Sequence, residues 1–333
     1  MRWHATVLLA AVLFAGCGAT TQTREPDMVV SGGSAPAPAT RPEDERRDRP
    51  QIAVVTHGQA SSAFWNIVRN GIEAASRQMD VQVIYRAPDV YSVDTMRQLI
   101  EDAIRTKPEG LVVSIPSEEL APVIRRAVKA DIPVVSINSG SDVSLALGTL
   151  AHVGQPEREA GFKAGQRLAA TGVRDALCVN QEIGNEGLDR RCAGFADALR
   201  KAGGVSKVLA VNDKDLAGTR RRLTTATSRS GVDAVLALNN TVGGLAAESV
   251  PERVKLATFD YSPEVLTALR SGRIEFSVDQ QPYLQGYLPV VFLAERARYG
   301  LFPAQGKVIP TGPNFVTRDT AAQAERLSAL GIR

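Results

Sequence analysis

From residue 51 onward, short runs of aliphatic and β-branched residues alternate with longer stretches in which apolar residues recur at helical spacing. The first run is 52–55, and the helical pattern after it covers 64–75. The same unit returns at 81–85 with 93–106, at 110–114 with 120–130, and as a last strand at 134–137. Continuous apolar strands joined by amphipathic helices are typical of a parallel sheet covered on both faces. The pattern therefore predicts an α/β fold with a doubly wound parallel sheet.

A second series of the same kind begins near Pro156. It predicts a helix to residue 171, a strand at 176–180, a helix from residue 189, and strands near Val208, Val235 and Leu256. The 333 residues suit two domains of about 150 residues each. We therefore expect two doubly wound lobes, with function in the loops that follow the strands, because open sheets bind ligands at the carboxyl ends of their strands.

Those loops are rich in neutral polar side chains. They are His57-Gly58-Gln59, Pro116-Ser117-Glu118, Asn138-Ser139-Gly140, Asn180-Gln181-Glu182, Asn239-Asn240-Thr241, Asp260-Tyr261 and Asp279-Gln280-Gln281. A side-chain amide offers both a donor and an acceptor, which suits a neutral ligand with many hydroxyl groups better than an anion. The loops predict a small neutral ligand.

Composition excludes several other classes. Thirty-nine Lys and Arg against 36 Asp and Glu leave a formal charge of +3, scattered along the chain, so nucleic acid is not an expected partner. Three cysteines and three histidines cannot build a Cys-rich zinc module, and we expect neither a metal nor a cofactor.

Catalysis is the weaker functional class. The chain has no Gly-x-Ser-x-Gly elbow, no Walker A loop and no His-Glu-x-x-His motif, and His57 and His152 have no identified nucleophile partner. Gly184 and Gly187 follow a strand but lack the spacing of a phosphate-binding fingerprint. The sequence therefore predicts a protein that is not an enzyme.

The N-terminus carries an export signal, which we assign to residues 1–17. Residues 5–15 are eleven residues without a charge, too few for the roughly 20 of a membrane-spanning helix but enough for a secretory signal. Residues 13–17 resemble the lipobox of bacterial lipoproteins, although Phe14 stands where Leu is usual. This resemblance implies a lipid on Cys17 and an anchor on the periplasmic or cell-surface face of the cytoplasmic membrane. An ordinary secretory signal is the alternative.

Residues 18–50 consist mostly of Thr, Gly, Ser, Ala, Pro and mixed charges. Such a segment buries too little apolar surface to offset its ordering entropy. We expect a disordered linker between the membrane anchor and the folded part.

The order of motifs from residue 51 to about 312 resembles the type I periplasmic binding proteins of the ribose and galactose group, which serve ATP-binding cassette importers. The matching motifs are Phe64-Trp65, Pro116-Ser117 with Ala121 and 132–135, Arg191 with Gly194-Phe195, Asn239, Phe259-Asp260 and Gln280. The resemblance implies two lobes joined by three crossing segments, near Gly154, Gln280 and Ile309. The N-terminal lobe would then hold 51–153 and 281–308, and the C-terminal lobe 154–280 and 309–333.

The resemblance also implies that a sugar or cyclic polyol binds between the lobes, that the lobes close on it, and that a membrane permease receives it from a monomeric binding protein. The residues implied in ligand binding are Phe64, Trp65, Asn138, Arg191, Asn239, Asp260 and Gln280. Trp65 would cover the apolar face of the ligand, Arg191 would donate to its oxygens and Asp260 would accept from its hydroxyls. The chain has Asn138-Ser139 where relatives have Asp-Arg, which argues against ribose itself.

Ordinary structural roles are open for the same residues. Trp65 can be a core residue, Arg191 a surface residue, and Asp260 the cap of the helix that begins near Pro263. Cys178 and Cys192 are fourteen positions apart, and the oxidising compartment of an exported protein favours a disulfide between them. Two buried thiols are the alternative.

Two further functions share this architecture. A receptor that feeds a chemotaxis or two-component sensor is the main competitor, and the sequence does not separate it from a transport protein. A sugar-responsive transcription repressor needs a helix-turn-helix ahead of the lobes, which residues 18–50 do not contain.

Overall fold

A computed structural model describes residues 49–58, 62–89, 91–228 and 231–333, which fall within one compact unit. The expected signal peptide, Cys17, nearly all of the linker and Gln59 lie outside these residues. No helix in the described part of the chain is both long and apolar enough to cross a membrane.

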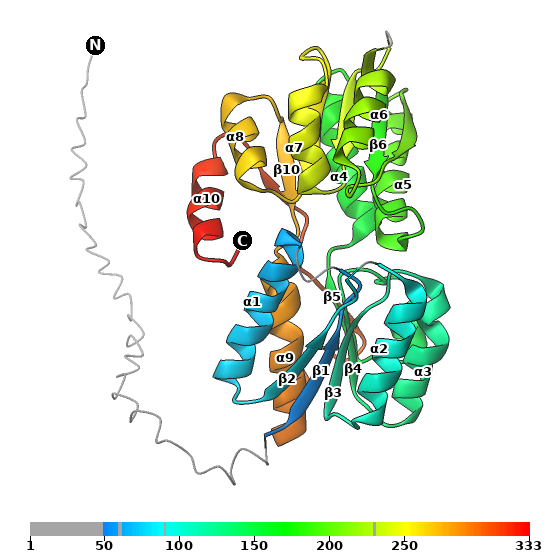
Figure 1. Cartoon of the computed structure of the whole chain (residues 1–333), viewed down its shortest axis with the longest axis vertical. Helices are drawn as coiled ribbons and strands as arrows, with labels where there is room; N and C mark the ends of the chain where they lie inside the picture. The colour runs from blue at the N-terminus through cyan, green and yellow to red at the C-terminus, as the bar shows by residue number, and fades with distance from the viewer. Residues whose placement is uncertain (1–48, 59–61, 90, 229–230) are drawn as a thin grey trace, which may run out of the picture. The chain divides into compact units, whose positions relative to one another are not determined.

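The first sheet has six parallel strands in the order β11-β5-β4-β3-β1-β2 (Figure 1). Their bounds are β1 Gln51–Val55, β2 Gln82–Arg86, β3 Gly110–Ser114, β4 Val134–Ile137, β5 Ala151–Gly154 and β11 Lys307–Pro310. Strands β3, β4 and β5 are buried along their whole length. The apolar runs predict this for β3 and β4, whereas β5 is not among the predicted strands.

Helices cover both faces of this sheet. Helices α1 (Ala63–Gln78) and α9 (Pro282–Tyr299) pack together on one face, and α2 (Val93–Arg105) and α3 (Ala121–Lys129) cover the other (Figure 1). Helix α9 thus comes from far along the chain to complete the first lobe.

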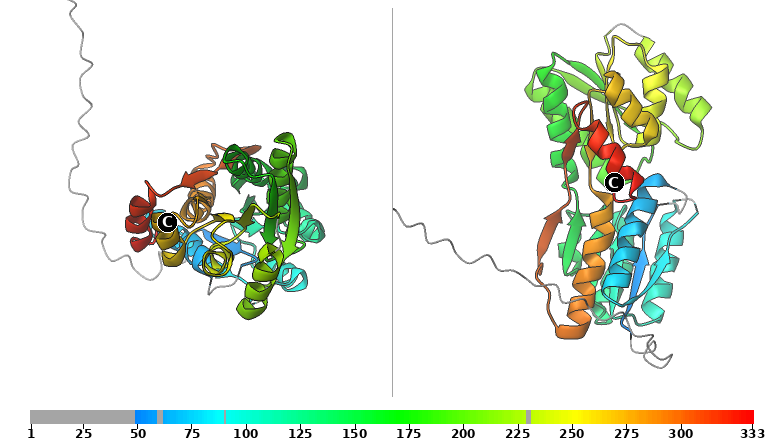
Figure 2. Two further views of the ribbon diagram at one scale, coloured as in Figure 1. Left: turned by 90° about the horizontal axis from the view of Figure 1, so that it is seen from above. Right: turned by 90° about the vertical axis from the view of Figure 1, so that its left-hand side faces the viewer.

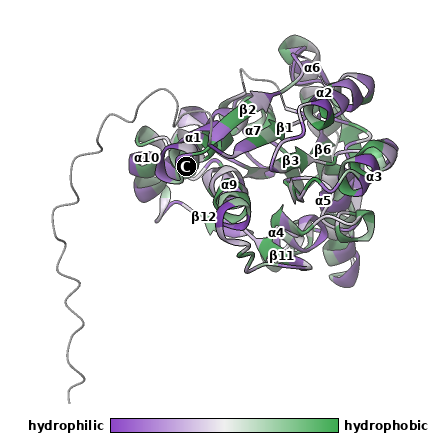
Figure 3. Cartoon of the chain, turned by 90° about the horizontal axis from the view of Figure 1, so that it is seen from below, coloured by the Kyte–Doolittle hydropathy of each residue, from purple (hydrophilic) through white to green (hydrophobic). Residues whose placement is uncertain are grey.

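The second sheet repeats the arrangement in the order β12-β10-β9-β8-β6-β7, with only β12 antiparallel. Its strands are β6 Asp175–Asn180, β7 Val205–Ala210, β8 Ala234–Ala237, β9 Lys255–Phe259, β10 Phe276–Asp279 and β12 Asn314–Val316. Helices α4 (Glu157–Ala170) and α5 (Glu186–Lys201) cover one face. The other face packs against α6 (Leu216–Ser228), α7 (Asn240–Ser249), α8 (Pro263–Ser271) and α10 (Ala321–Ala329). The helices carry both apolar and polar residues, as the mixed colours of their ribbons show (Figure 3).

The chain passes between the two sheets three times. It does so between β5 and α4, between β10 and α9, and between β11 and β12. Ile309 still belongs to β11, so the third crossing lies at residues 311–313, slightly later than expected from the sequence.

Helix α5 begins three residues before the predicted start at Asp189. Asn185 caps it, because its side-chain oxygen accepts a hydrogen bond of 3.0 Å from the Gly187 amide. Arg191 therefore lies in the second turn of α5 and does not open the helix.

Helices α4 and α5 approach each other closely through glycines. A Cβ atom on Gly161 would lie 1.9 Å from the Arg191 carbonyl oxygen, and one on Gly194 would lie 1.9 Å from the Arg158 carbonyl oxygen. Only glycine permits this contact between the two backbones. The contact holds the start of α4 beside the second turn of α5.

The C-terminal segment contacts both lobes. Helix α10 packs on α8 of the second lobe, whereas the Gly331 carbonyl accepts a hydrogen bond of 2.9 Å from Asn70 on α1 of the first. Arg333 then forms an ion pair of 3.1 Å with Asp279 at the second crossing. Figure 2 shows this segment, in red, beside the blue helix α1.

Candidate ligand-binding site

A cavity of about 280 Å³ lies at the carboxyl ends of the strands of both sheets. Its wall is formed by His57, Gly58, Ser62, Ala63, Phe64, Trp65, Tyr91, Asn138, Ser139, Gln181, Glu182, Asn185, Leu188, Arg191, Asp213, Lys214, Leu238, Asn239, Asn240, Thr241, Asp260 and Gln280. Most of these residues belong to loops that directly follow a strand, which is where open α/β sheets bind ligands.

The structure brings all seven sequence-predicted site residues to this wall. Phe64, Trp65 and Asn138 come from the first lobe, and Arg191, Asn239 and Asp260 come from the second. Gln280 lies in the second crossing, between β10 and α9.

The first lobe contributes an aromatic group to the cavity. The Trp65 ring meets His57 and Phe64 edge to face, with ring centroids 5.0 Å and 5.1 Å apart, and Tyr91 meets His57 at 5.8 Å. Trp65 is 6% exposed and packs in the core of the first lobe while it also lines the cavity, so it is both a core residue and a residue of the cavity wall.

His57 is fixed by Ser114 of β3. The His57 amide donates to the Ser114 Oγ at 2.9 Å, and its ring Nδ1 lies 2.8 Å from the same oxygen. Burial lowers the pKa of His57 despite the nearby Glu182 carboxylate. The imidazole is therefore neutral at neutral pH.

Arg191 is buried in the wall and is not a surface residue. Its Nε and Nη2 donate to the Glu157 carboxylate at 2.5 and 2.8 Å, and Nη2 also donates to Gln280 Oε1 at 3.0 Å. The guanidinium carbon lies 4.4 Å from the centroid of the Phe259 ring. The charge of Arg191 is thus already balanced within the protein.

Asp260 projects from a strained position after β9, with φ of +57°. Its Oδ1 accepts a hydrogen bond of 2.9 Å from Gln280 Nε2. Burial raises the pKa of Asp260 to about 7, against the opposing effects of Arg191 and of this hydrogen bond. Asp260 does not cap α8, because Ser262 does so by accepting from the Val265 amide.

Amide side chains complete the wall. Asn138, at φ of +60°, donates from Nδ2 to Gln280 Oε1 at 3.4 Å and to Gln285 Oε1 at 3.2 Å. Asn239 caps α7 by accepting from the Val242 amide at 2.8 Å, and its Nδ2 donates to Asp213 at 3.0 Å. These amides are held in place by hydrogen bonds to other protein groups.

Sequence reasoning missed part of the wall. Tyr91 follows β2, and Asp213 and Lys214 follow β7, so the strand-end rule covers these residues too, although their loops are not among the predicted ones. Asp213 also adds a carboxyl group to those of Glu182 and Asp260, which the predicted loops already contain.

One predicted loop does not reach the cavity. Residues 116–118 are absent from its wall, and the Pro116 carbonyl instead accepts a hydrogen bond of 3.0 Å from the Glu186 amide at the start of α5. This loop contacts the other lobe directly.

Further hydrogen bonds join the two lobes at the start of α5. The Ser139 Oγ donates to Asn185 Oδ1 at 3.1 Å, and Asn185 Nδ2 lies 3.3 Å from His57 Nε2. The first turn of α5 therefore closes one side of the cavity against two loops of the first lobe.

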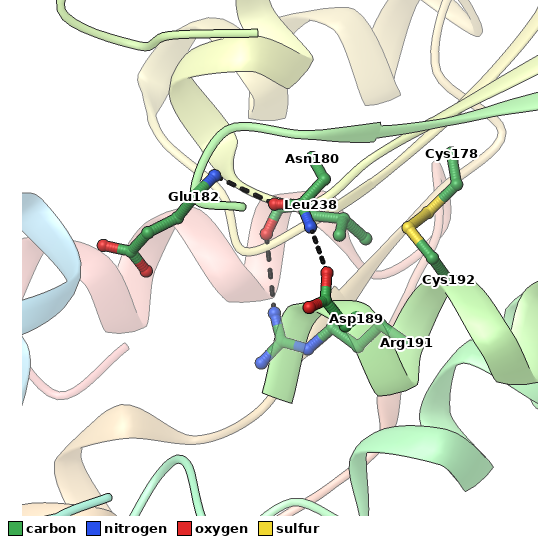
Figure 4. Close-up of a disulfide and its surroundings, with 7 residues drawn as sticks. All are labelled: Cys178, Asn180, Glu182, Asp189, Arg191, Cys192 and Leu238. Carbon is green, nitrogen blue, oxygen red and sulfur yellow. Dashed lines mark hydrogen bonds between the residues drawn. A yellow bond between two sulfur atoms is a disulfide. The ribbon is translucent and has the colours of Figure 1, made fainter. Parts of the chain in front are cut away.

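A disulfide joins Cys178 of β6 to Cys192 of α5, with the Cα atoms 5.6 Å apart (Figure 4). Cys192 directly follows Arg191, and Figure 4 shows the guanidinium pointing away from the sulfur atoms, towards the Leu238 carbonyl. Asn180 and Asp189 add a hydrogen bond of 2.9 Å between the same strand and helix. The helix that carries Arg191 is thus bound covalently to the second sheet.

Among the described residues, no group of three or more His, Cys, Asp or Glu side chains is arranged to hold a metal ion. The polar groups of the cavity are instead amides, hydroxyls and paired charges. Such a wall can bind and orient a small polar molecule by hydrogen bonds.

Solved structures share this architecture. The chain superposes on a carbohydrate transporter from Acidothermus cellulolyticus, solved in complex with myo-inositol, with a TM-score of 0.80 and 32% identity over 86% of this chain and 100% of the other. It also shares its fold with a carbohydrate transporter solute binding protein from Agrobacterium radiobacter, solved with D-arabinose, at a TM-score of 0.73 and 24% identity, covering 86% of this chain and 99% of that one.

Sequence comparison agrees with the fold. A D-ribose/D-allose-binding protein of Pseudomonas aeruginosa is 23% identical over 293 residues, which cover 82% of this chain and 87% of the relative. The family model of the periplasmic binding protein domain matches residues 52–300. Together with the two doubly wound lobes, this match shows that the chain belongs to the periplasmic binding proteins and has the type I fold.

Proposed function

We propose that the protein captures a small neutral sugar or cyclic polyol in this cavity, outside the cytoplasm, and delivers it to an ATP-binding cassette importer without altering it. The observation that carries the proposal is the composition of the wall. The Trp65 ring shares one small cavity with the amides of Asn138, Asn239 and Gln280 and with the Asp260 carboxyl. An aromatic face and a set of donors and acceptors match the C–H face and the hydroxyl groups of a sugar.

The charges of the wall favour a neutral ligand over an anion. Arg191 is paired with Glu157, and the Lys214 ammonium lies 3.8 Å from Asp213. Among the described residues, Glu182 and Asp260 have no Lys or Arg side chain at ion-pair distance, and the His57 ring 3.9 Å from Glu182 is neutral at neutral pH. A phosphorylated or carboxylated sugar would therefore meet unfavourable charge.

The relative solved with myo-inositol is 32% identical, which supports placing cyclic polyols first among the candidate ligands. The volume of about 280 Å³ is at the small end for ligand pockets and suits a single ring. We propose that the ligand is a monosaccharide or a cyclitol and not an oligosaccharide.

We also propose that a lipid on Cys17 anchors the protein to the membrane. Lipidation at Cys17 would keep the protein near the permease, and two acyl chains anchor stably where one is marginal. A Cys17→Ser variant should lose the lipid mass and leave the membrane fraction. Unchanged mass and unchanged partitioning would contradict the anchor and leave the binding function untouched.

A thermal-shift screen tests the binding function. We expect myo-inositol, other cyclitols, pentoses or hexoses to raise the melting temperature, because a ligand selective for the folded state stabilises it. Calorimetry then gives the affinity, and mass spectrometry of the recovered ligand should show no conversion. Failure of every neutral compound, or steady turnover of one, would reject the proposal.

A further inference from the structure

We infer that Glu157, which does not line the cavity, is the positioning residue that fixes the Arg191 guanidinium there and so governs how Asp260 meets a ligand. The inference rests on the proposed function. It concerns a residue whose role depends on a contact between two helices, because Glu157 lies at the start of α4, three residues after the end of β5.

The contact between Glu157 and Arg191 fixes the orientation of the guanidinium. Both side chains are nearly inaccessible, at 2% and 4% exposure. Glu157 Oε2 and Oε1 accept from Nε and Nη2 at 2.5 and 2.8 Å, which is the two-point geometry that defines the plane of a guanidinium. The carboxylate is itself held by Gln155, which donates from Nε2 to Oε2 at 3.0 Å.

Arg191 in turn orients the side-chain amide of Gln280. Arginine can only donate hydrogen bonds, so the Gln280 atom that lies 3.0 Å from Nη2 must be the amide oxygen. The amide nitrogen of Gln280 then faces Asp260 and donates to it at 2.9 Å. Glu157 therefore determines, through Arg191, which end of the Gln280 amide Asp260 meets.

The same contact sets the charge around Asp260. The charged groups that act on its carboxyl are Arg191, Asp279 and Glu157, and burial itself disfavours ionisation. The positive charge of Arg191 is largely offset by the Glu157 side chain, which lies closer to it. Removal of the Glu157 charge would leave Arg191 to act on Asp260, and the pKa of Asp260 would fall.

A purely structural role is the competing explanation. Buried ion pairs add little net stability but are costly to break, so a loss of stability in a Glu157 variant does not discriminate. The discriminating observations are the pH profile of ligand binding and the dependence of the effect on Arg191.

The experiment uses the full chain with Glu157→Gln, and Glu159→Gln as the matched control. Glu159 lies on the same helix two residues later, is exposed, and pairs at 2.6 Å with Lys163 one turn away. The neutral compound that binds best among myo-inositol, D-arabinose, D-ribose and D-glucose is titrated by calorimetry from pH 5 to pH 9. A ¹³C NMR titration of the Asp carboxyl groups, assigned with Asp260→Asn, follows Asp260 without any ligand.

We expect Glu157→Gln to lower the midpoint of the Asp260 titration by about one pH unit or more, while Glu159→Gln leaves it unchanged. At pH 8.5, where Asp260 is ionised in both proteins, Glu157→Gln should weaken binding roughly tenfold, equivalent to about 1.4 kcal/mol. An unchanged midpoint and unchanged affinity in Glu157→Gln would overturn the inference.

A second comparison tests whether Glu157 acts through Arg191. In an Arg191→Met background the additional Glu157→Gln change should alter affinity at pH 8.5 by less than about twofold, since the group to be positioned is gone. A further tenfold loss in the double variant would overturn the inference, even if Glu157→Gln alone does not fold. If no neutral compound binds the wild-type protein, the proposed function fails, whereas the NMR titration still decides the effect of Glu157 on Asp260.

Discussion

Arg190 and Asp142 form an ion pair between the lobes, with Nη1 and Oδ2 2.5 Å apart. Arg190 lies on α5 of the second lobe, and Asp142 follows β4 of the first. The next residue of the helix, Arg191, lines the cavity. Two consecutive arginines of one helix therefore make different contacts: Arg190 pairs with the other lobe, and Arg191 lines the proposed ligand site.

The pair between Arg190 and Asp142 should favour the closed arrangement. We expect Arg190→Gln to weaken ligand binding about twofold to fivefold, because an exposed ion pair contributes up to about 1 kcal/mol. Calorimetry at low salt and in 0.5 M salt checks this, and the difference should shrink at the higher ionic strength. The control is Arg220→Gln, which breaks a pair with Glu248 inside the second lobe. An equal effect of both variants on affinity would contradict a role in closure.

Asp260 should make stability depend on pH. Its pKa of about 7 in the folded protein lies above the ordinary value of 3.8. The contribution of the protonated Asp260 carboxyl to the free energy of unfolding is therefore complete below about pH 4. It is lost as the pH rises through about 7, because the folded protein must then ionise a buried carboxyl. Urea unfolding of the ligand-free protein between pH 4 and pH 8 measures this. Asp260→Asn should make the free energy of unfolding less dependent on pH over that range. If the variant shows the same pH dependence as the wild type, the dependence arises from other groups.

The disulfide should contribute stability with little effect on the cavity. Closing a loop of this size stabilises a protein by roughly 3 kcal/mol in the loop-entropy description. We expect the Cys178→Ala/Cys192→Ala variant to unfold at lower denaturant concentration, and reductant to lower the wild-type midpoint but not that of the variant. Affinity should fall less than about threefold, since Glu157 still holds Arg191.

The close contact of α4 and α5 should not tolerate a methyl group at Gly161. A Cβ atom there meets the Arg191 carbonyl, so Gly161→Ala must push the helices apart, at a cost of roughly 1–3 kcal/mol. We expect a lower melting temperature and weaker ligand binding. Gly244→Ala on α7 is the control, because its Cβ would meet only Glu264, at 3.6 Å, and alanine favours the helix. Equal melting temperatures for the two variants would show that α4 can shift without cost.

The sequence predicts the sheets and the position of the cavity because both follow from local pattern. Apolar runs such as 110–114 and 134–137 are fully buried strands, and the loops after them can be located by counting along the chain. Asn138, Asn239 and Asp260 could be placed on the cavity wall for this reason.

The rest of the site depends on contacts between distant segments. Glu157 and Arg191 are 34 positions apart, and their pairing requires the close approach of α4 and α5 at Gly161 and Gly194. No spacing rule within a single element contains that information. The sequence pattern predicts the start of α5 three residues too late for a local reason: Asn185 caps the helix, and Asp189 lies inside it.

Trp65 has a consequence for how this protein can be studied. The sequence contains two tryptophans, and the other, Trp3, belongs to the expected signal peptide. The mature protein would then carry a single indole fluorophore, placed on the cavity wall in edge contact with His57. Its emission should respond directly to a molecule that enters the cavity, so the protein contains its own optical reporter, and stopped-flow recordings could follow association without any attached dye.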